Sequence, residues 1–544
     1  MRKHIFTLSF LIFNLSCIIV NAQTPIPAQP KLVVGIVVDQ MRYDFLYRYY
    51  SKYSTGGFKR LMTQGTNCKD VQYNYFPTYT GPGHAAIYTG SVPAINGIIG
   101  NDWFDRETKT MVYVTGDINY HTVGAGGTSG NMSPQRMNTT TVTDQLRLST
   151  NFKSKVIGIS LKDRSAILPA GHTGNSAYWL DGVSGNWITS SFYMDSLPKW
   201  VKDFNAEQYP KKYLSQTWNT LLPIEQYTES TTDNIVHESS LPGELQPVFP
   251  HHLSDSTWVK YDLLKYTPFG NTILKDFAIR TIKNENLGKG SATDFLCVSF
   301  SSTDYVGHTF GPNAIESEDT YLRLDKDLAE FFSFLDVWLG KNNYLIFLTA
   351  DHGVAPIAAL ANEYHIPAGT QNETALFDSI KQVLQNSFGD SSLILAFENQ
   401  QLYLNYSSLE KKNKTADDVV KLIRPMLMRQ KGIYNVFAFE QFGETIMTDE
   451  MKQILSNSYN PARSGDIMIN YEPYWLGWRT KGTSHGAIFS YDTHVPLLWY
   501  GWKIKTGDDN QLHHITDIAP TLSNLLNIQE PNGTTGNVIE LMKK

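Results

Sequence analysis

The chain has 544 residues, of which 41% are hydrophobic, 12% aromatic and 18% charged, values that are ordinary for a globular protein with a large core. The net charge of −6 is mild for this length and argues against nucleic-acid binding. Length alone allows several domains, although large α/β enzymes can be built on one elaborated core.

The N-terminus has the pattern of a secretory signal peptide. Arg2 and Lys3 begin it, a mostly apolar stretch follows, and Ala22 ends a small-residue cleavage motif. The alternative, a lipoprotein signal at Cys17, is less favoured because Asn14 stands where an aliphatic residue is usual. No later stretch is apolar for long enough to span a membrane. We therefore expect an exported chain, periplasmic or extracellular, cleaved near Ala22.

Strand-like and helix-like segments alternate along the chain. Apolar runs predict strands, and a helical spacing of apolar residues predicts the helix 319–339, with a further helix near 518–526. This alternation predicts an α/β fold: a doubly wound, mostly parallel sheet flanked by helices. The predicted core strands cover residues 31–38, 155–160, 294–301, 344–349 and 495–500.

Two insertions interrupt this pattern. The first, about 175–270, contains a predicted hairpin at 177–190 and then an irregular stretch rich in Trp and Tyr. The second, about 358–470, contains strand-like runs and a helix near 416–428, which predict a small α+β cap. We expect a single catalytic domain over residues 23–544 that carries both insertions.

The cysteines and two histidine pairs give weaker signals. Cys68 and Cys297 remain after signal removal, too few for a disulfide scaffold or a thiolate metal site. Cys297 lies in an apolar run and is expected to be buried in a strand, and whether the two cysteines pair is open. The histidine pairs lie away from the strand ends and are expected at the surface: His251-His252 and His513-His514.

The stretch 75–101 contains the most suggestive motif. Thr80 precedes Gly81-Pro82-Gly83, and proline is accepted in the first turn of a helix. Thr80 is therefore predicted as the N-cap of a helix, where free N–H donors and the helix dipole suit a phosphoryl group. The alternative is an ordinary capping threonine. His84, in the same stretch, is expected to have a structural role.

The predicted strand ends and glycine turns carry residue types that bind divalent metals. Asp304 and His308, four apart on a helical turn, share one face. Neighbouring side chains in a strand point to opposite faces, so Asp351 and His352 can share a site only if the chain leaves the strand, which Gly353 permits. Two further candidates stand after the first strand and in a glycine-flanked turn: Asp39 and His485.

These motifs, taken in order, resemble the alkaline phosphatase superfamily. They are Asp39, FPTYTGPGH, GNDWFD, TDYVGH, TADHG and GTSHG, and they span the mature core. The chain is most similar to the PafA-type members, which are secreted, monomeric, phosphate-irrepressible alkaline phosphatases with a threonine nucleophile. It lacks the Cys/Ser-x-Pro-x-Arg motif of sulfatases and a third, carboxylate-rich magnesium site, whose role a Lys and Arg pair takes in PafA-type enzymes.

The resemblance implies a dizinc phosphatase that hydrolyses small phosphate monoesters through a phosphothreonine on Thr80. One zinc ion would be held by Asp304, His308 and His485. The other would be held by Asp39, Asp351 and His352. The phosphate oxygens would be bound by Asn101, Lys162 and Arg164. Two ions about 4 Å apart can clamp the attacking and leaving oxygens of an in-line displacement.

Two alternative functions stay open at this point. A phosphodiesterase or nucleotide pyrophosphatase can be built on the same core with a threonine nucleophile. Lys162 and Arg164 favour the monoesterase, because their charges suit a dianionic substrate better than a monoanionic diester. A non-catalytic exported binding protein would be expected to lack ligands or the nucleophile, and all these positions are filled.

Overall fold

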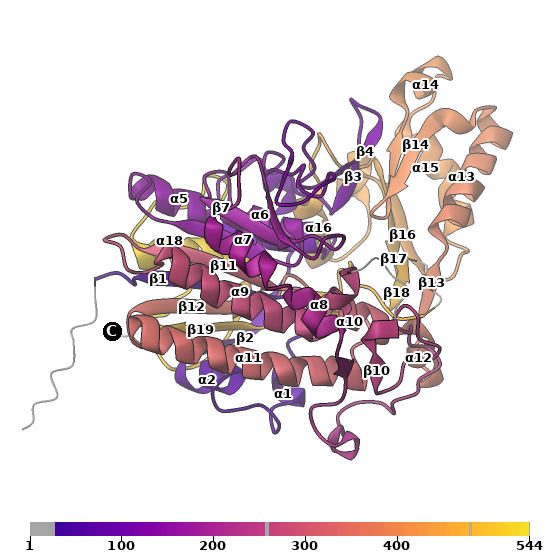
Figure 1. Ribbon diagram of the computed structural model, residues 1–544. Helices are drawn as coiled ribbons and strands as arrows, with labels where there is room; N and C mark the ends of the chain where they lie inside the picture. Colours follow the sequence, from indigo (N-terminus) through magenta and orange to yellow (C-terminus); the bar gives the residue numbers. More distant parts are fainter. Residues whose placement is uncertain (1–27, 256–260, 478, 480, 543–544) are drawn as a thin grey trace, which may run out of the picture.

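A computed structural model describes residues 28–255, 261–477, 479 and 481–542. The expected signal peptide and Cys17 lie outside these residues. A ten-stranded sheet forms the centre of the molecule, and helices cover both of its faces (Figure 1). The predicted fold class, an α/β sheet flanked by helices, is confirmed.

The middle of the sheet is parallel. Its five neighbouring strands are, in spatial order, β12 (Tyr344–Thr349), β1 (Leu32–Val38), β11 (Asp294–Phe300), β6 (Val156–Ser160) and β7 (Ser176–Leu180). In register, Val38 lies beside Phe300 and Val37 beside Thr349, so the carboxyl ends of β1, β11 and β12 coincide. These strands are buried throughout, which explains why they are continuous apolar runs rather than alternating ones.

Antiparallel pairs of strands occur at both edges of the sheet, and one edge also contains a parallel pair. One edge consists of β19 (Leu497–Gly501), β2 (Thr66–Gln72) and β20 (Gly507–His514), and the other of β8 (Trp187–Ser190) and β5 (Thr122–Val123). Strands β7 and β8 form the predicted hairpin, but they belong to the main sheet, so the expected start of the first insertion at about 175 is wrong. Strand β20 has the sequence GDDNQLHH and is mostly exposed, so no apolar pattern in the sequence predicts it. Its parallel pairing with β2 is what defines it.

The helices form two layers. Helices α2 (Phe58–Gln64), α9 (Phe269–Glu285) and α11 (Ile315–Leu339) cover one face, and α3 (Thr80–Thr89), α5 (Val142–Ser149), α6 (Asp163–Ala170) and α18 (Ile518–Leu526) cover the other (Figure 1). Helix α11 begins at Ile315, earlier than the predicted start at 319. No helix within the described ranges is long and apolar enough to cross a bilayer.

The second insertion contains a smaller sheet with its own helices. Its strand order is β14 (Ile394–Glu398), β15 (Gln401–Leu404), β17 (Ile467–Tyr471) and β16 (Ile433–Ala438). Helices α13 (Glu373–Phe388) and α15 (Ala416–Leu427) pack on it, at the upper right of Figure 1. The buried side chains here form a hydrophobic cluster of their own, distinct from that of the main sheet.

The surface placement expected for the histidine pairs is wrong for one member of each. His251 is fully buried beside the Trp218 ring, and its ring nitrogens face Glu244 at 2.9 Å and Glu316 at 3.3 Å. These carboxylates stabilise a buried imidazolium, which explains its position. His252 is exposed, as expected. His513 is buried because β20 pairs with β2 and carries its side chain inward.

The two cysteines do not form a disulfide. Cys297 is buried in β11, as predicted, and Cys68 is buried in β2. Strands β19, β12 and β1 lie between β2 and β11, so the two thiols are too far apart to pair.

We expect His251 to contribute pH-dependent stability. Burial alone would lower the pKa of His251, but Glu244 and Glu316 outweigh it and raise the pKa from 6.5 to about 9. Burial raises the pKa of Glu316 despite His251, so the nearer Glu244 is the principal partner. Because the folded pKa is the higher one, this stabilisation is complete below the unfolded pKa and disappears as the pH rises through about 9.

Wild type should therefore have a higher free energy of unfolding than His251→Gln at mildly acidic pH. This advantage should be smaller at pH 10, by up to about 3 kcal/mol. Denaturant titrations at the two pH values measure this. His252→Gln, the exposed neighbour, is the control and should show no such dependence. An equal difference at both pH values would contradict the assigned ion pair.

Candidate active site

The predicted metal ligands converge at the carboxyl ends of β1, β11 and β12. Asp39 follows β1, and Asp351 and His352 follow β12, where the chain has left the strand. Asp304 and His308 lie on α10 (Ser302–Phe310), one turn apart, directly after β11. Ligand sites of parallel sheets lie at this edge, and here the coincident strand ends explain the convergence.

Thr80 is the first residue of α3 rather than its N-cap. Tyr79 is the N-cap, with extended backbone (φ −113°, ψ 161°), and Pro82 lies within the first turn, where it interrupts no helical hydrogen bond. The predicted capping role of Thr80 is therefore wrong by one position. The Thr80 hydroxyl still lies at the positive end of the helix, and the residue is 1% exposed.

Helix α3 packs directly on the loop that carries Asp351. A Cβ atom added at Gly83 would lie 2.3 Å from the Asp351 carbonyl oxygen and 2.8 Å from its Cβ. Only glycine allows this approach. His485 is held in a comparable way, because the flanking Gly482 (φ +70°) and Gly486 (φ +109°) adopt left-handed backbone conformations. The glycines therefore fix how closely Thr80, Asp351 and His485 approach one another.

The first ligand group consists of Asp39, Asp351 and His352. One ligand atom from each lies within 4.8 Å of the others. His352 Nε2 lies 3.5 Å from Asp39 Oδ1 and 3.6 Å from Asp351 Oδ2. All three residues are completely buried.

The second ligand group is centred on Asp304. Its Oδ1 lies 3.2 Å from His308 Nε2 and 3.6 Å from His485 Nε2. His352 joins this group as well, since its ligand atom lies within 4.8 Å of those of Asp304 and His485. The rings of His352 and His485 stack with centroids 3.5 Å apart. The two expected ligand sets are thus brought together as neighbours that meet at His352.

The three histidines are oriented by backbone carbonyls. The Nδ1 atoms of His308, His352 and His485 lie 2.9, 2.9 and 2.7 Å from the carbonyl oxygens of Thr483, Gly353 and Thr78. A ring nitrogen that faces a carbonyl must carry the proton, so each Nε2 is left with a free lone pair. This is the usual second-sphere arrangement of metal-binding histidines.

The residues fit a divalent cation. Asp39 Oδ1, Asp351 Oδ2 and His352 Nε2 are buried and have no hydrogen-bond partner among the described residues. Burial and the adjacent Asp351 carboxylate raise the pKa of Asp39 well above its usual value. Uncompensated buried charges of this kind are costly, whereas a bound cation satisfies all of these atoms. Mixed carboxylate and imidazole ligands suit zinc-class ions.

Lys162 links the two groups. Its ammonium is buried and lies 2.6 Å from Asp39 Oδ2 and 2.7 Å from Asp304 Oδ2. Burial alone would lower the pKa of Lys162, but Asp304 and Asp39 outweigh it and raise the pKa, so the amine remains charged. The Tyr305 ring lies 5.0 Å from Nζ. For Asp304, burial is outweighed by His308 and Lys162, which hold its pKa well below the usual value.

Arg164 and Asn101 lie beside Thr80. Arg164 Nη2 is 3.5 Å from Thr80 Oγ1, and Nη1 donates to the Tyr113 hydroxyl at 3.1 Å. Arg164 Nε is buried, and no described residue accepts a hydrogen bond from it. Asn101 Oδ1 accepts from the Gly81 N–H at 2.8 Å, which turns the amide NH₂ away from the backbone. The Arg164 guanidinium therefore faces the threonine hydroxyl, and Asn101 is held against the next residue of the helix.

Two residues of the site, Gln40 and Tyr113, were not predicted from the sequence. Gln40, with φ +64°, donates from Nε2 to Asp304 Oδ1 at 2.7 Å and from its backbone N–H to Asp351 Oδ1 at 3.1 Å. The only sequence signal was its place next to Asp39, since a left-handed non-glycine residue follows no pattern. Tyr113 lies on β4 (Thr110–Tyr113), and nothing in the sequence there indicated a role.

His84 has the structural role that was expected. Its Nδ1 lies 2.9 Å from the Thr80 carbonyl oxygen and its Nε2 lies 2.9 Å from Ser299 Oγ. Burial lowers the pKa of His84 to about 4, so the ring is neutral. The histidine therefore holds the first turn of α3 against β11.

Two hollows open onto the site. One of about 390 Å³ is lined by Lys162, Arg164, Tyr305 and His308. The other, of about 220 Å³, lies between core residues that include Tyr79 and His485 and insertion residues that include Glu373 and Gln400. Arg479 borders both. The second insertion therefore forms one wall of the space around His485.

The parallel sheet and the carboxylate–imidazole groups at its carboxyl edge define an α/β metalloenzyme. The chain belongs to the type I phosphodiesterase / nucleotide pyrophosphatase family, whose pattern matches residues 33–495, and within it to the PafA-type alkaline phosphatases of the alkaline phosphatase superfamily. The resemblance read from the motifs is confirmed.

Similar proteins match over nearly their full length. Alkaline phosphatase PafA of Elizabethkingia meningoseptica is 47% identical, with 94% of each chain covered. Alkaline phosphatase PhoV of Synechococcus elongatus is 46% identical over 95% of this chain and 94% of the relative. A Myroides odoratus protein named calcium-transporting ATPase is 46% identical over 94% of each chain. The crystal structure of wild-type alkaline phosphatase PafA has a TM-score of 0.92 and 46% identity, covering 96% of this chain and 100% of that one.

We expect removal of metal to destabilise the protein, because buried carboxylates then lose their counter-ion. Dialysis against a chelator should lower the melting temperature by about 5 °C or more, and added Zn²⁺ should restore it. Thermal unfolding monitored together with metal analysis measures both effects.

Asp39→Asn is the matched variant, because it removes one buried charge. The chelated variant should be more stable than chelated wild type, and Zn²⁺ should stabilise it less. A melting temperature that does not respond to chelation or to Zn²⁺ in wild type would rule out a metal centre at these residues.

Proposed function

We propose that the chain is an exported alkaline phosphatase that hydrolyses small phosphate monoesters through a phosphothreonine intermediate on Thr80 and releases inorganic phosphate. The observation that carries this proposal is the position of the Thr80 hydroxyl. It lies at the N-terminus of α3, 3.5 Å from the Arg164 guanidinium, and α3 packs on the loop that carries Asp351. The full-length similarity to alkaline phosphatases supports it.

The metal centre would hold two zinc ions. Asp39, Asp351 and His352 would bind one, and Asp304, His308 and His485 the other. Such ions supply Lewis-acid activation of a hydroxyl or water and stabilise a leaving oxygen. The buried unpartnered ligand atoms and the free Nε2 lone pairs support this assignment.

The protein residues around Thr80 perform the chemistry as follows. Thr80 Oγ attacks phosphorus and loses its proton, the bond to the leaving oxygen breaks, and the alcohol departs after taking up a proton. Water then attacks the phosphothreonine, the bond between phosphorus and Thr80 Oγ breaks, and Thr80 regains a proton as inorganic phosphate leaves. His84 is neutral and engaged with the Thr80 carbonyl, so it does not serve as the base.

Charge determines the preferred substrate in this proposal. Lys162, Arg164 and the amide of Asn101 would bind the non-bridging oxygens of the phosphoryl group. A dianionic monoester can accept more charge-assisted hydrogen bonds from them than a monoanionic diester can. Arg164 Nε is a buried donor that no residue in the described part of the chain satisfies, which supports an anionic ligand at this point.

A phosphodiesterase is the second candidate function, because the matched family is described by that activity. A non-catalytic binding protein has no comparable support, since the relatives that match over the full length carry enzyme names. We further propose that the N-terminal signal directs the enzyme out of the cytoplasm and that it acts as a monomer, as its sequence resemblance implies.

Thr80→Ala should remove most turnover without releasing metal. Loss of a covalent nucleophile lowers kcat by at least about 10³-fold in other hydrolases. Hydrolysis of p-nitrophenyl phosphate and metal analysis of the same preparation test this. Thr89→Ala is the control, because Thr89 lies at the other end of α3 and its hydroxyl donates to the Ala85 carbonyl. Near-wild-type turnover in Thr80→Ala would refute the phosphothreonine.

Lys162→Ala and Arg164→Ala should reduce monoester hydrolysis about 10- to 100-fold more than diester hydrolysis, the range expected for lost charge-assisted hydrogen bonds. The comparison uses p-nitrophenyl phosphate and its methyl ester. Because Lys162 contacts two metal-ligand candidates, retained metal must be verified. Lys265→Ala is the matched control, since Lys265 lies near the site but pairs with Asp262 at 2.7 Å. Equal losses for both substrates, or a wild type that prefers the diester, would favour the phosphodiesterase.

A further inference from the structure

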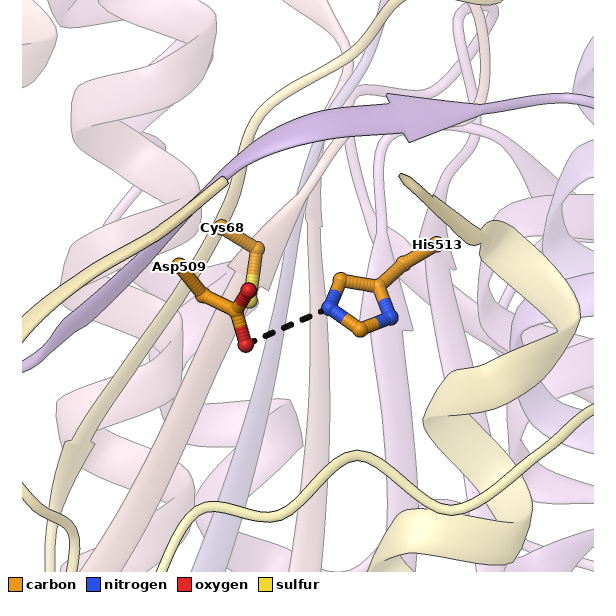
Figure 2. Close-up of side chains that lie close together, drawn as sticks. All are labelled: Cys68, Asp509 and His513. Atoms are coloured by element: carbon orange, nitrogen blue, oxygen red, sulfur yellow. Dashed lines mark ion pairs between the residues drawn. The ribbon is translucent and has the colours of Figure 1, made fainter. Parts of the chain in front are cut away.

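A third group of potential metal ligands lies outside the active site. Cys68 Sγ, an Asp509 carboxylate oxygen and a His513 ring nitrogen all lie within 4.8 Å of one another. Figure 2 shows that the three side chains point toward a common centre. This group shares no residue with the two ligand groups at the active site.

The group lies at the edge of the main sheet. Cys68 is on β2 and the other two residues are on β20, the last strand of this edge. Strands β19 and β12 separate β2 from β1, at whose end the active site begins. The group is therefore a separate feature of the fold, and its role does not depend on the proposed catalytic function.

A β-bulge brings the ligand atoms together. Cys68 is the register partner of Asp509, and two residues later Asp70 is the partner of Leu512, so β20 has one extra residue in this interval. In a regular strand, residues four apart such as Asp509 and His513 are separated by about 13 Å. Here Asp509 Oδ2 and His513 Nε2 lie 3.3 Å apart, because a bulge bends the strand and redirects its side chains.

The histidine nitrogen that points into the group is unsatisfied. His513 is 9% exposed, and its Nε2 has no hydrogen-bond partner in the parts of the chain that the structure covers, since its approach to Asp509 lacks hydrogen-bond geometry. On the other side of the ring, Nδ1 lies 3.8 Å from Asp517 Oδ2. Asp517 is itself fixed by the backbone N–H groups of His514 at 2.9 Å and Asn537 at 2.7 Å.

We propose that Cys68, Asp509 and His513 form a structural binding site for a zinc-class divalent metal ion. Thiolate sulfur, imidazole nitrogen and carboxylate oxygen are the three ligand types that Zn²⁺ takes in proteins. Asp517 Oδ2, 3.8 Å from Nδ1, is the carboxylate beside the other ring nitrogen, and in the proposed site it would move into hydrogen-bond distance when the metal holds Nε2. Asp509 is only partly buried, so solvent can supply a fourth ligand.

The burial of Cys68 decides between a metal site and a reactive thiol. A Cys–His–Asp group can also activate a nucleophile, but Cys68 has no exposed surface and no substrate can reach it. The metal would instead join β20, a polar strand at the sheet edge, to β2. Two cysteines are too few for a site built from thiolates alone, but one thiolate can bind a metal together with an imidazole and a carboxylate.

Cobalt substitution tests the site. The full-length protein is stripped with a chelator and reloaded with Co²⁺, whose thiolate complexes show a sulfur-to-cobalt charge-transfer band in the near ultraviolet. The active-site candidates offer only nitrogen and oxygen ligands, so the band reports on Cys68. We expect the band in wild type, its absence in Cys68→Ala, and its retention in Cys297→Ala, the matched change at the other buried cysteine.

Three further measurements make the test decisive. Zinc content should fall by one ion per chain in Cys68→Ala relative to Cys297→Ala, with phosphatase turnover unchanged. If Cys68→Ala does not fold, His513→Gln retains the thiol and should still abolish or shift the band. Asp517→Asn should weaken Co²⁺ binding about 10- to 100-fold. A wild type without the band, or a band that persists in Cys68→Ala, would overturn the site, whereas loss of activity alone would bear only on the proposed function.

Discussion

The mutual repulsion of three buried carboxylates is the constraint on which the structure of the active site depends. Asp39 and Asp351 follow the ends of neighbouring strands and Asp304 lies in the helix after the third, all buried from solvent, where like charges cannot remain without compensation. Lys162 neutralises part of this charge through its contacts with Asp39 and Asp304. A bound cation would compensate the remainder, and the histidines present their free Nε2 atoms toward these carboxylates. The charged groups of the site therefore come from several strand ends, helices and loops, and no single element contains both the carboxylates and the groups that neutralise them.

The sheet and α3 together determine the distances between the Thr80 hydroxyl and the ligand groups. The registers of β1 with β11 and β12 place three strand ends side by side, and the glycine at position 83 lets α3 rest on the Asp351 backbone. A shift of α3 would displace the Thr80 hydroxyl and the first ligand group at once. Helix α3 is completely buried, because it is packed on all sides, and this explains why its sequence has no amphipathic pattern.

The sequence was informative where burial and chemistry leave a pattern. Continuous apolar runs identified β1 and β12, and the polar residues just after them identified Asp39 and Asp351 as site residues. The sequence gives no signal where a strand is defined only by its pairing with another strand. Strand β20 has no apolar period, so both the strand and the burial of His513 were missed. Gln40 was missed because its left-handed backbone is imposed by contacts distant in sequence. The α3 boundary differed by one residue, since the backbone of Tyr79 decides it.

The separate hydrophobic cluster of the second insertion determines which parts of the chain can change independently of one another. Because this unit packs around its own interior, its outer surface can change without disturbing the main sheet on which the strand-end ligands depend. Yet it supplies Glu373, Gln400 and other residues to the wall facing His485. Under the proposed function, the wall that faces the departing group and the residues around Thr80 are thus encoded in different parts of the chain. The insertion can therefore change its outline around this space while the strand ends that carry the ligands stay in place.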